Sequence, residues 1–175
     1  MGLDLSTRAA ACVVVPYGWQ GNWKDLRSAV FGEPLARDAT DQDRALRCGS
    51  IASQIVAFAL VHGVGTVWIE SYAYNQNKSA HTLGELGGVV RLELVLAGLD
   101  VQTANMTSAR SLLLGRLPRR KGKRGPSAKD AVKAALGAAG ASFATLDEYD
   151  AFVVANWGQS EAGRFCFAQR KQGPP

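Results

Sequence analysis

The sequence has few of the residues that form zinc sites and disulfide frameworks. Its three cysteines, Cys12, Cys48 and Cys166, are far apart and odd in number, and its two histidines, His62 and His81, stand alone. There is no CxxC pair and no Cys/His cluster, which argues against a structural zinc site. Cysteines without evident partners are typical of a reducing compartment, so we expect a cytoplasmic protein.

Long apolar runs and targeting signals are also missing. We find no apolar run that reaches the ~20 residues needed to span a bilayer. The first residues lack the charged-then-apolar order of a signal peptide. We therefore expect no membrane among the partners of this protein.

The composition is that of an ordinary folded domain with a basic bias. The 175 residues are 47% apolar and 20% charged, enough for one domain with its own core, and the formal net charge is +5. A net positive charge by itself favours a polyanionic partner only weakly. Its position is more informative, because one short stretch without acids contains six basic residues: Arg116, Arg119, Arg120, Lys121, Lys123 and Arg124.

Periodicity predicts an α/β protein built on a five-stranded sheet. Apolar and β-branched runs between turn residues indicate strands at 2–5, 10–16, 26–31, 66–70 and 99–103. Apolar residues at helical spacing indicate helices at 41–60, 79–97, 106–114, 128–136 and 145–158. Two pairs have capping-box spacing, Thr40 with Asp43 and Thr145 with Glu148, and Ser127 is a further N-cap candidate. This order predicts a mixed sheet with helices on its faces.

Four acids occupy informative positions in this arrangement. Asp4 and Glu70 end two strands that are far apart in the chain, and Asp147 and Asp150 share one face of the last helix. Carboxylates gathered at one sheet edge repel each other unless cations hold them. Oxygen ligands of this kind suit Mg²⁺ or Mn²⁺, and two such ions about 3.5–4 Å apart can clamp a phosphodiester during its displacement.

Each acid also has an ordinary interpretation. Asp4 and Glu70 could be polar strand ends, and Asp147 could serve only the helix dipole. We assign Glu148 to capping. The hypothesis of a metal site depends on the four acids occurring together in this order.

Five motifs in sequence order resemble those of the RuvC family of Holliday junction resolvases, which has the RNase H-like fold. They are Gly2-Leu3-Asp4-Leu5-Ser6, Val67-Trp68-Ile69-Glu70, the segment from Asn77 to Gly84 followed by Gly87 and Val89, Ser127-Ala128-Lys129 with Val132, and Leu146-Asp147-Glu148-Tyr149-Asp150-Ala151. The match covers residues 1–157. The Ser127 motif is one residue tighter than in the family. Three further features depart from the family pattern: the first strand is shorter than expected, the basic loop from Arg116 to Arg124 is longer and more charged than in the bacterial type, and the tail after Gly158 has no counterpart. These departures indicate a divergent, phage-like branch.

The resemblance implies a metal-dependent endonuclease that cuts four-way DNA junctions. It implies that residues 1–158 form the nuclease domain and that the protein acts as a homodimer in a bacterial or phage-infected cell. From composition, residues 159–175, which end in Gln-Gly-Pro-Pro, are expected to form a partly disordered tail. The implied catalytic metal ligands are Asp4, Glu70, Asp147 and Asp150, holding two Mg²⁺ ions, with Mn²⁺ as a possible substitute.

DNA contacts are expected outside the acids. The basic stretch from Arg116 to Arg124, with Lys129 close after it, would neutralise phosphates, although a solvated basic loop is the alternative. The resemblance implies an aromatic residue that stacks on an unpaired junction base, and Tyr72 and Tyr74 are both candidates. Asn77 and Lys78 complete the predicted DNA-binding set.

Three alternative functions share parts of this pattern. A ribonuclease H or an integrase-type enzyme would have the same acids without the Asn77-to-Gly84 and Ser127-Ala128-Lys129 motifs. A non-catalytic DNA-binding module would gain nothing from four carboxylates facing phosphates. Sugar kinases of the actin-like group share the opening motif, but this chain is too short for their two lobes.

Overall fold

A single five-stranded sheet runs through the protein in the computed structural model, which describes residues 1–6, 8–32, 35–36, 38–71, 80–115 and 127–161. The strand order is β3-β2-β1-β4-β5. Strand β2 pairs antiparallel with β1 and β3, whereas β4 pairs parallel with β1 and β5. The bounds are β1 (Gly2–Leu5), β2 (Ala10–Val14), β3 (Arg27–Phe31), β4 (Thr66–Glu70) and β5 (Asp100–Ala104). The predicted mixed sheet is confirmed.

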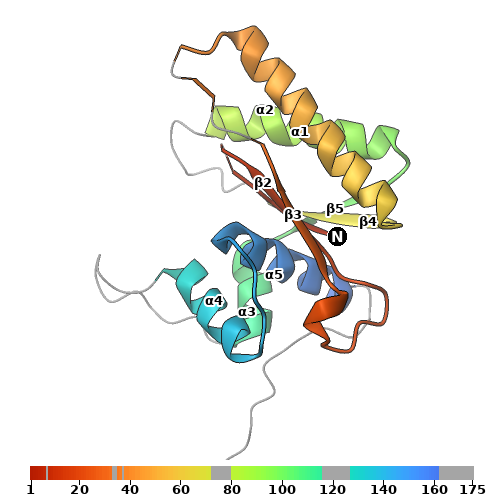
Figure 1. Ribbon diagram of the computed structural model, residues 1–175, viewed down its shortest axis with the longest axis vertical. Coiled ribbons are helices and arrows are strands. Elements are labelled where there is room, and N and C mark those ends of the chain that lie inside the picture. The colour runs from red at the N-terminus through yellow and green to blue at the C-terminus, as the bar shows by residue number, and fades with distance from the viewer. Residues whose placement is uncertain (7, 33–34, 37, 72–79, 116–126, 162–175) are drawn as a thin grey trace, which may run out of the picture.

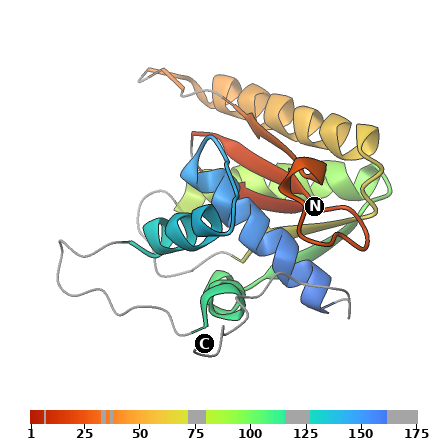
Figure 2. The same ribbon diagram turned by 60° about the horizontal axis from the view of Figure 1, so that its bottom comes forward.

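Helices cover both faces of the sheet (Figure 1). Helices α1 (Asp41–Val61) and α2 (Ala80–Leu96) pack together on one face. Helices α3 (Met106–Leu114), α4 (Ala128–Ala138) and α5 (Leu146–Glu161) lie on the other, and a short 3₁₀ helix, Trp23–Asp25, precedes β3. A view turned by 60° shows the same two helical layers on either side of the strands (Figure 2). Helix α5 continues three residues beyond its predicted end at Gly158.

Strand β2 is buried on both faces because it lies between two hydrophobic cores. Ala11 and Val13 face the core formed with α3, α4 and α5, whereas Ala10, Cys12 and Val14 face the core formed with α1 and α2. This explains the continuous apolar run in the sequence. Cys12 and Cys48 are free and buried, and burial raises the pKa of both thiols, as expected for inert core cysteines. Cys166 lies outside the described residues.

Helix α5 lies directly against β1 because residue 2 is a glycine. A Cβ atom at Gly2 would lie 2.1 Å from the carbonyl oxygen of Ala151 and 2.4 Å from the amide nitrogen of Ala155. Both are backbone atoms of α5, so no side-chain rotation could relieve the clash. Gly2 therefore fixes how closely the strand that contains Asp4 approaches the helix that contains Asp147 and Asp150.

Three helices begin with the capping interactions that the sequence predicts. Thr40 and Asp43 form a capping box at α1, and Ser127 forms one with Asp130 at α4. At α5 the backbone N–H of Thr145 donates to Glu148, whose own N–H donates to the Thr145 hydroxyl. The capping assignment of Glu148 is confirmed.

By length and composition, α1 could also cross a membrane. An 18-residue window of this 21-residue helix has a mean hydropathy of 1.3, and α1 alone among the described helices meets this criterion. The helix also contains Asp41, Asp43, Arg44 and Arg47, so it meets the criterion by length and average composition and not by an uninterrupted apolar run. Core helices of soluble proteins often meet the same criterion, and Ile51, Ala52, Ile55 and Ala59 of α1 are buried against the sheet.

Candidate active site

The four predicted acids come from three elements that end or begin at the same edge of the sheet. Strands β1 and β4 are parallel neighbours, with Gly2 opposite Trp68 and Leu3 opposite Ile69, so the next pair in register is Asp4 and Glu70. Asp147 and Asp150 lie in the first turns of α5, which packs against β1. The ends of β1 and β4 and the start of α5 therefore lie at one edge of the sheet, as the sequence predicted.

The ammonium of Lys129 lies among three of these carboxylates. Its Nζ atom is 2.9 Å from Oδ2 of Asp4, 2.6 Å from Oδ1 of Asp147 and 3.1 Å from Oδ2 of Asp150. Lys129 stands in the first turn of α4, and the Ser127 cap fixes where that turn begins. We predicted Lys129 as a DNA contact near the basic stretch, and the structure places its charged end inside the acid cluster.

Arg110 is a second cation of the site, and our sequence analysis did not identify it. From α3, its Nε and Nη2 atoms donate to the two oxygens of Asp150 at 3.2 and 2.7 Å. This two-point geometry is the strongest that a side-chain cation can offer to a carboxylate. The side chain of Asp150 is only 1% exposed, so the ion pair lies inside the protein.

Burial and neighbouring charges shift the pKa values of this cluster. Burial raises the pKa of Asp4 to about 7, although Lys129 opposes the shift, and the negative charges of Asp150 and Glu70 add to it. Burial also raises the pKa of Glu70, with Arg110 opposing. For Lys129, burial would lower the pKa, but Asp4, Asp147 and Asp150 together raise it above the ordinary value. The site therefore holds excess negative charge that protons and cations both relieve.

The donor atoms suit a hard divalent cation. All four candidate ligands offer carboxylate oxygens, which Mg²⁺ and Mn²⁺ prefer. Within the described ranges, however, no three His, Cys, Asp or Glu side chains are arranged to share one metal ion as they stand. The Lys129 ammonium instead bridges three of these carboxylates. The donor set nevertheless fits such an ion by its chemistry, and the Lys129 ammonium is a resident cation with which the ion would compete.

Of the predicted DNA-binding residues, Lys129 is the one that lies within the described residues. Tyr72, Tyr74, Asn77 and Lys78 lie outside the described residues, as do the six basic residues between Arg116 and Arg124. The described chain resumes at Ser127, two residues before Lys129. The basic stretch is therefore joined through a short segment to the edge of the acid cluster.

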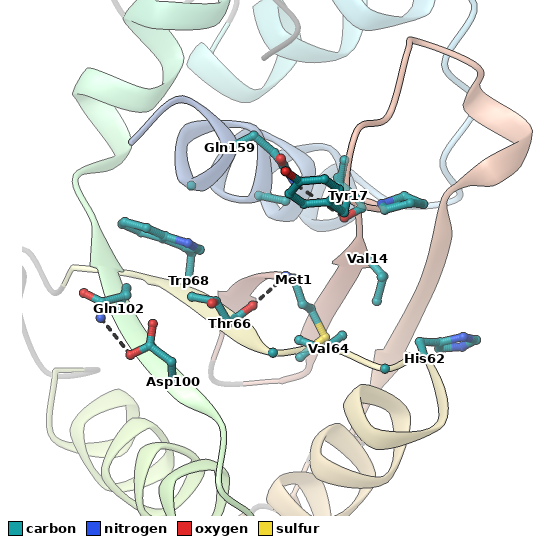
Figure 3. Close-up of a pocket in the computed structure, with 16 residues that line it drawn as sticks. Met1, Val14, Tyr17, His62, Val64, Thr66, Trp68, Asp100, Gln102 and Gln159 are labelled. Carbon is teal, nitrogen blue, oxygen red and sulfur yellow. Dashed lines mark hydrogen bonds between the residues drawn. The ribbon is translucent and has the colours of Figure 1, made fainter. Parts of the chain in front are cut away.

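A separate cavity of about 700 Å³ lies at the opposite end of the sheet from the acids. Figure 3 shows Trp68 and Gln102 on one side of it, Tyr17 and Gln159 on another, and His62 near its rim. At this cavity the N-terminal ammonium of Met1 donates to the carbonyl oxygen of Thr66. The side-chain amide of Gln102 donates to the carboxylate of Asp100. Because this cavity adjoins the starts of β1 and β4, it contains none of the four acids.

Known structures share this arrangement of strands and helices, although no family model and no curated protein matches the sequence. The RuvC structure from Thermus thermophilus aligns with a TM-score of 0.63, covering 93% of this chain and 95% of that one at 20% identity. RuvC from T. thermophilus in complex with a Holliday junction substrate gives 0.61, with 93% and 94% coverage and 18% identity. The protein thus has an RNase H-like α/β fold of the RuvC type, as predicted, and at this identity the likeness concerns the fold alone.

Proposed function

We propose that this protein is a metal-dependent endodeoxyribonuclease that resolves four-way DNA junctions and related branched DNA by hydrolysing phosphodiester bonds. The observation that carries the proposal is the cluster of buried Asp4 and Asp150 with half-buried Asp147 at the edge of a RuvC-type sheet. A cluster that needs cations for its charge balance has little use in a protein that only binds phosphates. The Holliday junction bound by the T. thermophilus relative supports the choice of substrate.

We assign the metal-binding role to Asp4, Glu70, Asp147 and Asp150, with Mg²⁺ as the ion and Mn²⁺ as a substitute. Ions held by these carboxylates would polarise a phosphoryl oxygen and lower the pKa of a bound water so that it can act as the nucleophile. The protein contributes placement, because β1, β4 and α5 hold the four carboxylates at one edge. Lys129 is about one-third exposed, so its ammonium can leave the acids and pair with a phosphate of the substrate.

We assign the holding of DNA to the basic stretch between Arg116 and Arg124, which continues to α4 and the acid cluster. Each phosphate that a lysine or arginine neutralises releases counterions, so binding should weaken steeply as salt increases. One of Tyr72 and Tyr74, which closely follow Glu70, would stack on an unpaired base at the junction centre. Asn77 and Lys78 would contact the backbone beside it.

We also propose a homodimer, because symmetric cleavage of a junction needs two active sites related by a two-fold axis. The outer face of α2 offers a surface for the second copy. Leu92, Val95 and Leu96 are between 57% and 71% exposed there. On the same helix, Cβ atoms at Gly84 and Gly88 would meet nothing within 4 Å among the described residues. These glycines therefore do not pack on their own sheet, and they would allow a partner helix to approach closely.

A comparison of substrates separates the proposal from its alternatives. The wild-type protein with Mg²⁺ is offered a four-way DNA junction, a linear duplex of the same sequence and an RNA–DNA hybrid. Resolution of the junction with little cleavage of the other two supports the proposal. Preferred cleavage of the hybrid would identify a ribonuclease H activity instead, and tight junction binding without cleavage in Mg²⁺ or Mn²⁺ would identify a binding module.

A further inference from the structure

Two protein cations hold Asp150 at the same time. Arg110 donates to Oδ1 through Nε at 3.2 Å and to Oδ2 through Nη2 at 2.7 Å, and the Lys129 ammonium lies 3.1 Å from Oδ2. Both oxygens of this buried carboxylate are thus engaged. A divalent ion that uses Asp150 as a ligand must share these oxygens with the two cations or displace one of them, and the like charges oppose its binding.

The charge of the cluster leads to the same conclusion. Asp4, Glu70, Asp147 and Asp150 carry −4 when ionised, and Arg110 with Lys129 carries +2, which leaves −2. One divalent ion neutralises this remainder. A second ion would bring the site to +2 unless a protein cation moves away, and excess positive charge at such short range is unfavourable.

The two cations differ in how readily they can move. Lys129 has a flexible stem, is 35% exposed and holds each carboxylate through one ammonium. Arg110 is 17% exposed and holds both oxygens of Asp150 through a planar fork. Arg110 is therefore the stronger competitor for a metal ion on the Asp150 side of the cluster.

We propose that Arg110 is a built-in counter-ion that competes with divalent metal for Asp150, so that the site binds one ion readily and a second only when the guanidinium releases the carboxylate. The proposal rests on the proposed metal-dependent function. Arg110 is in this respect a positioning residue, because it acts through Asp150. Release of Asp150 would also free the guanidinium for another anion at the same edge.

Metal binding to the full chain without DNA tests this directly. Mn²⁺ is titrated into EDTA-stripped protein by calorimetry, and bound ions are counted by electron paramagnetic resonance. We expect the wild type to bind a second ion at least about tenfold more weakly than the first. In Arg110→Gln the second dissociation constant should fall about tenfold or more, because a positive charge that repels the ion is gone, and Arg110→Lys should lie between. Arg44→Gln, which removes an exposed ion pair with Asp41, should match the wild type.

Thermal unfolding gives a second readout. In EDTA, Arg110→Gln should melt below the wild type, because Asp150 stays buried with less compensation, and added Mn²⁺ should raise its melting temperature by more than it raises that of the wild type. If Arg110→Gln does not fold, Arg110→Lys decides the question, since it retains the charge without the fork.

The outcomes distinguish a failure of the proposed role of Arg110 from a failure of the proposed metal-dependent function. A folded Arg110 variant whose second dissociation constant is unchanged or higher overturns the role of Arg110. Two ions bound with equal affinity by the wild type overturn it as well, and leave metal dependence intact. A wild type that binds no Mn²⁺ at millimolar concentration contradicts the proposed function itself.

Discussion

The ammonium of Lys129 lies 2.9 Å from the carboxylate of Asp4, although 125 residues separate the two in the chain. Asp4 is nearly buried and Lys129 also contacts Asp147, so one cation joins the end of β1 to the starts of α4 and α5. The contact stabilises an edge that would otherwise hold several carboxylates at short range. Stability and metal binding should therefore depend on the same residue.

Replacement of Lys129 should destabilise the protein chiefly when no metal is present. Lys129→Ala leaves the three carboxylates without their shared cation. Breaking a buried pair costs about 3–5 kcal/mol, and partial exposure of Lys129 reduces the expected loss to about 2 kcal/mol. Urea unfolding in EDTA and in Mg²⁺ measures this, and Mg²⁺ should recover most of the loss. Lys133→Ala, on an exposed position of α4, should stay within about 0.5 kcal/mol of the wild type in both buffers.

Asp4 should make the protein less stable as pH rises. Its pKa is about 7 in the folded protein against 3.8 ordinarily, so the folded state binds this proton more tightly than the unfolded state. Its contribution is fully present below pH ~4 and is lost as pH rises to about 7, by at most about 4 kcal/mol. The free energy of unfolding in EDTA, measured from pH 4 to 8, should fall less in Asp4→Asn than in the wild type. Asp41→Asn, at a fully exposed position, is the control, and equal slopes for Asp4→Asn and the wild type would contradict the assignment.

The contact between Gly2 and α5 should tolerate no side chain. A Cβ at residue 2 would lie 2.1 Å from a backbone oxygen, so we expect Gly2→Ala to lower the free energy of unfolding by about 3 kcal/mol and to displace Asp4 from α5. Gly137→Ala, at an exposed position of α4 with open space around it, should instead stabilise the protein by about 0.5–1 kcal/mol. Chemical denaturation compares the two, and a neutral Gly2→Ala would show that β1 and α5 can separate.

The outer face of α2 should mediate dimer formation. Leu92→Arg and Val95→Arg place charges on the exposed apolar face, and each should convert a dimer to a monomer without loss of secondary structure. Light scattering after gel filtration measures the mass, with circular dichroism as the test of folding. Ala134→Arg, an exposed position of α4 on the other face of the sheet, should remain dimeric. A wild type that is monomeric at all concentrations would remove this part of the proposal.

The sequence revealed the acids and the caps because each obeys a local rule. Strand ends, helix starts and capping boxes follow from spacing alone, and the structure has Thr40, Ser127 and Thr145 in the predicted roles. Arg110 could not be found in this way, because an arginine in a short amphipathic helix is usually exposed, and its inward direction depends on how α3 packs against α5. The same holds for Lys129, whose position near the basic stretch suggested DNA while tertiary packing turned it toward Asp4. The requirement for glycine at residue 2 follows from the short distance between β1 and α5, which the sequence alone does not reveal.

Cleavage of a labelled four-way DNA junction by the wild type and by Asp4→Asn is the most direct test of the central claim. Asp4→Asn keeps the size and a hydrogen-bonding oxygen, and it removes the charge that a metal ion needs. With Mg²⁺ the wild type should make paired nicks at symmetric positions, EDTA should abolish them, and Asp4→Asn should bind the junction as tightly as the wild type without cutting it. Junction cleavage by Asp4→Asn at the wild-type rate, or by the wild type in EDTA, would contradict the account.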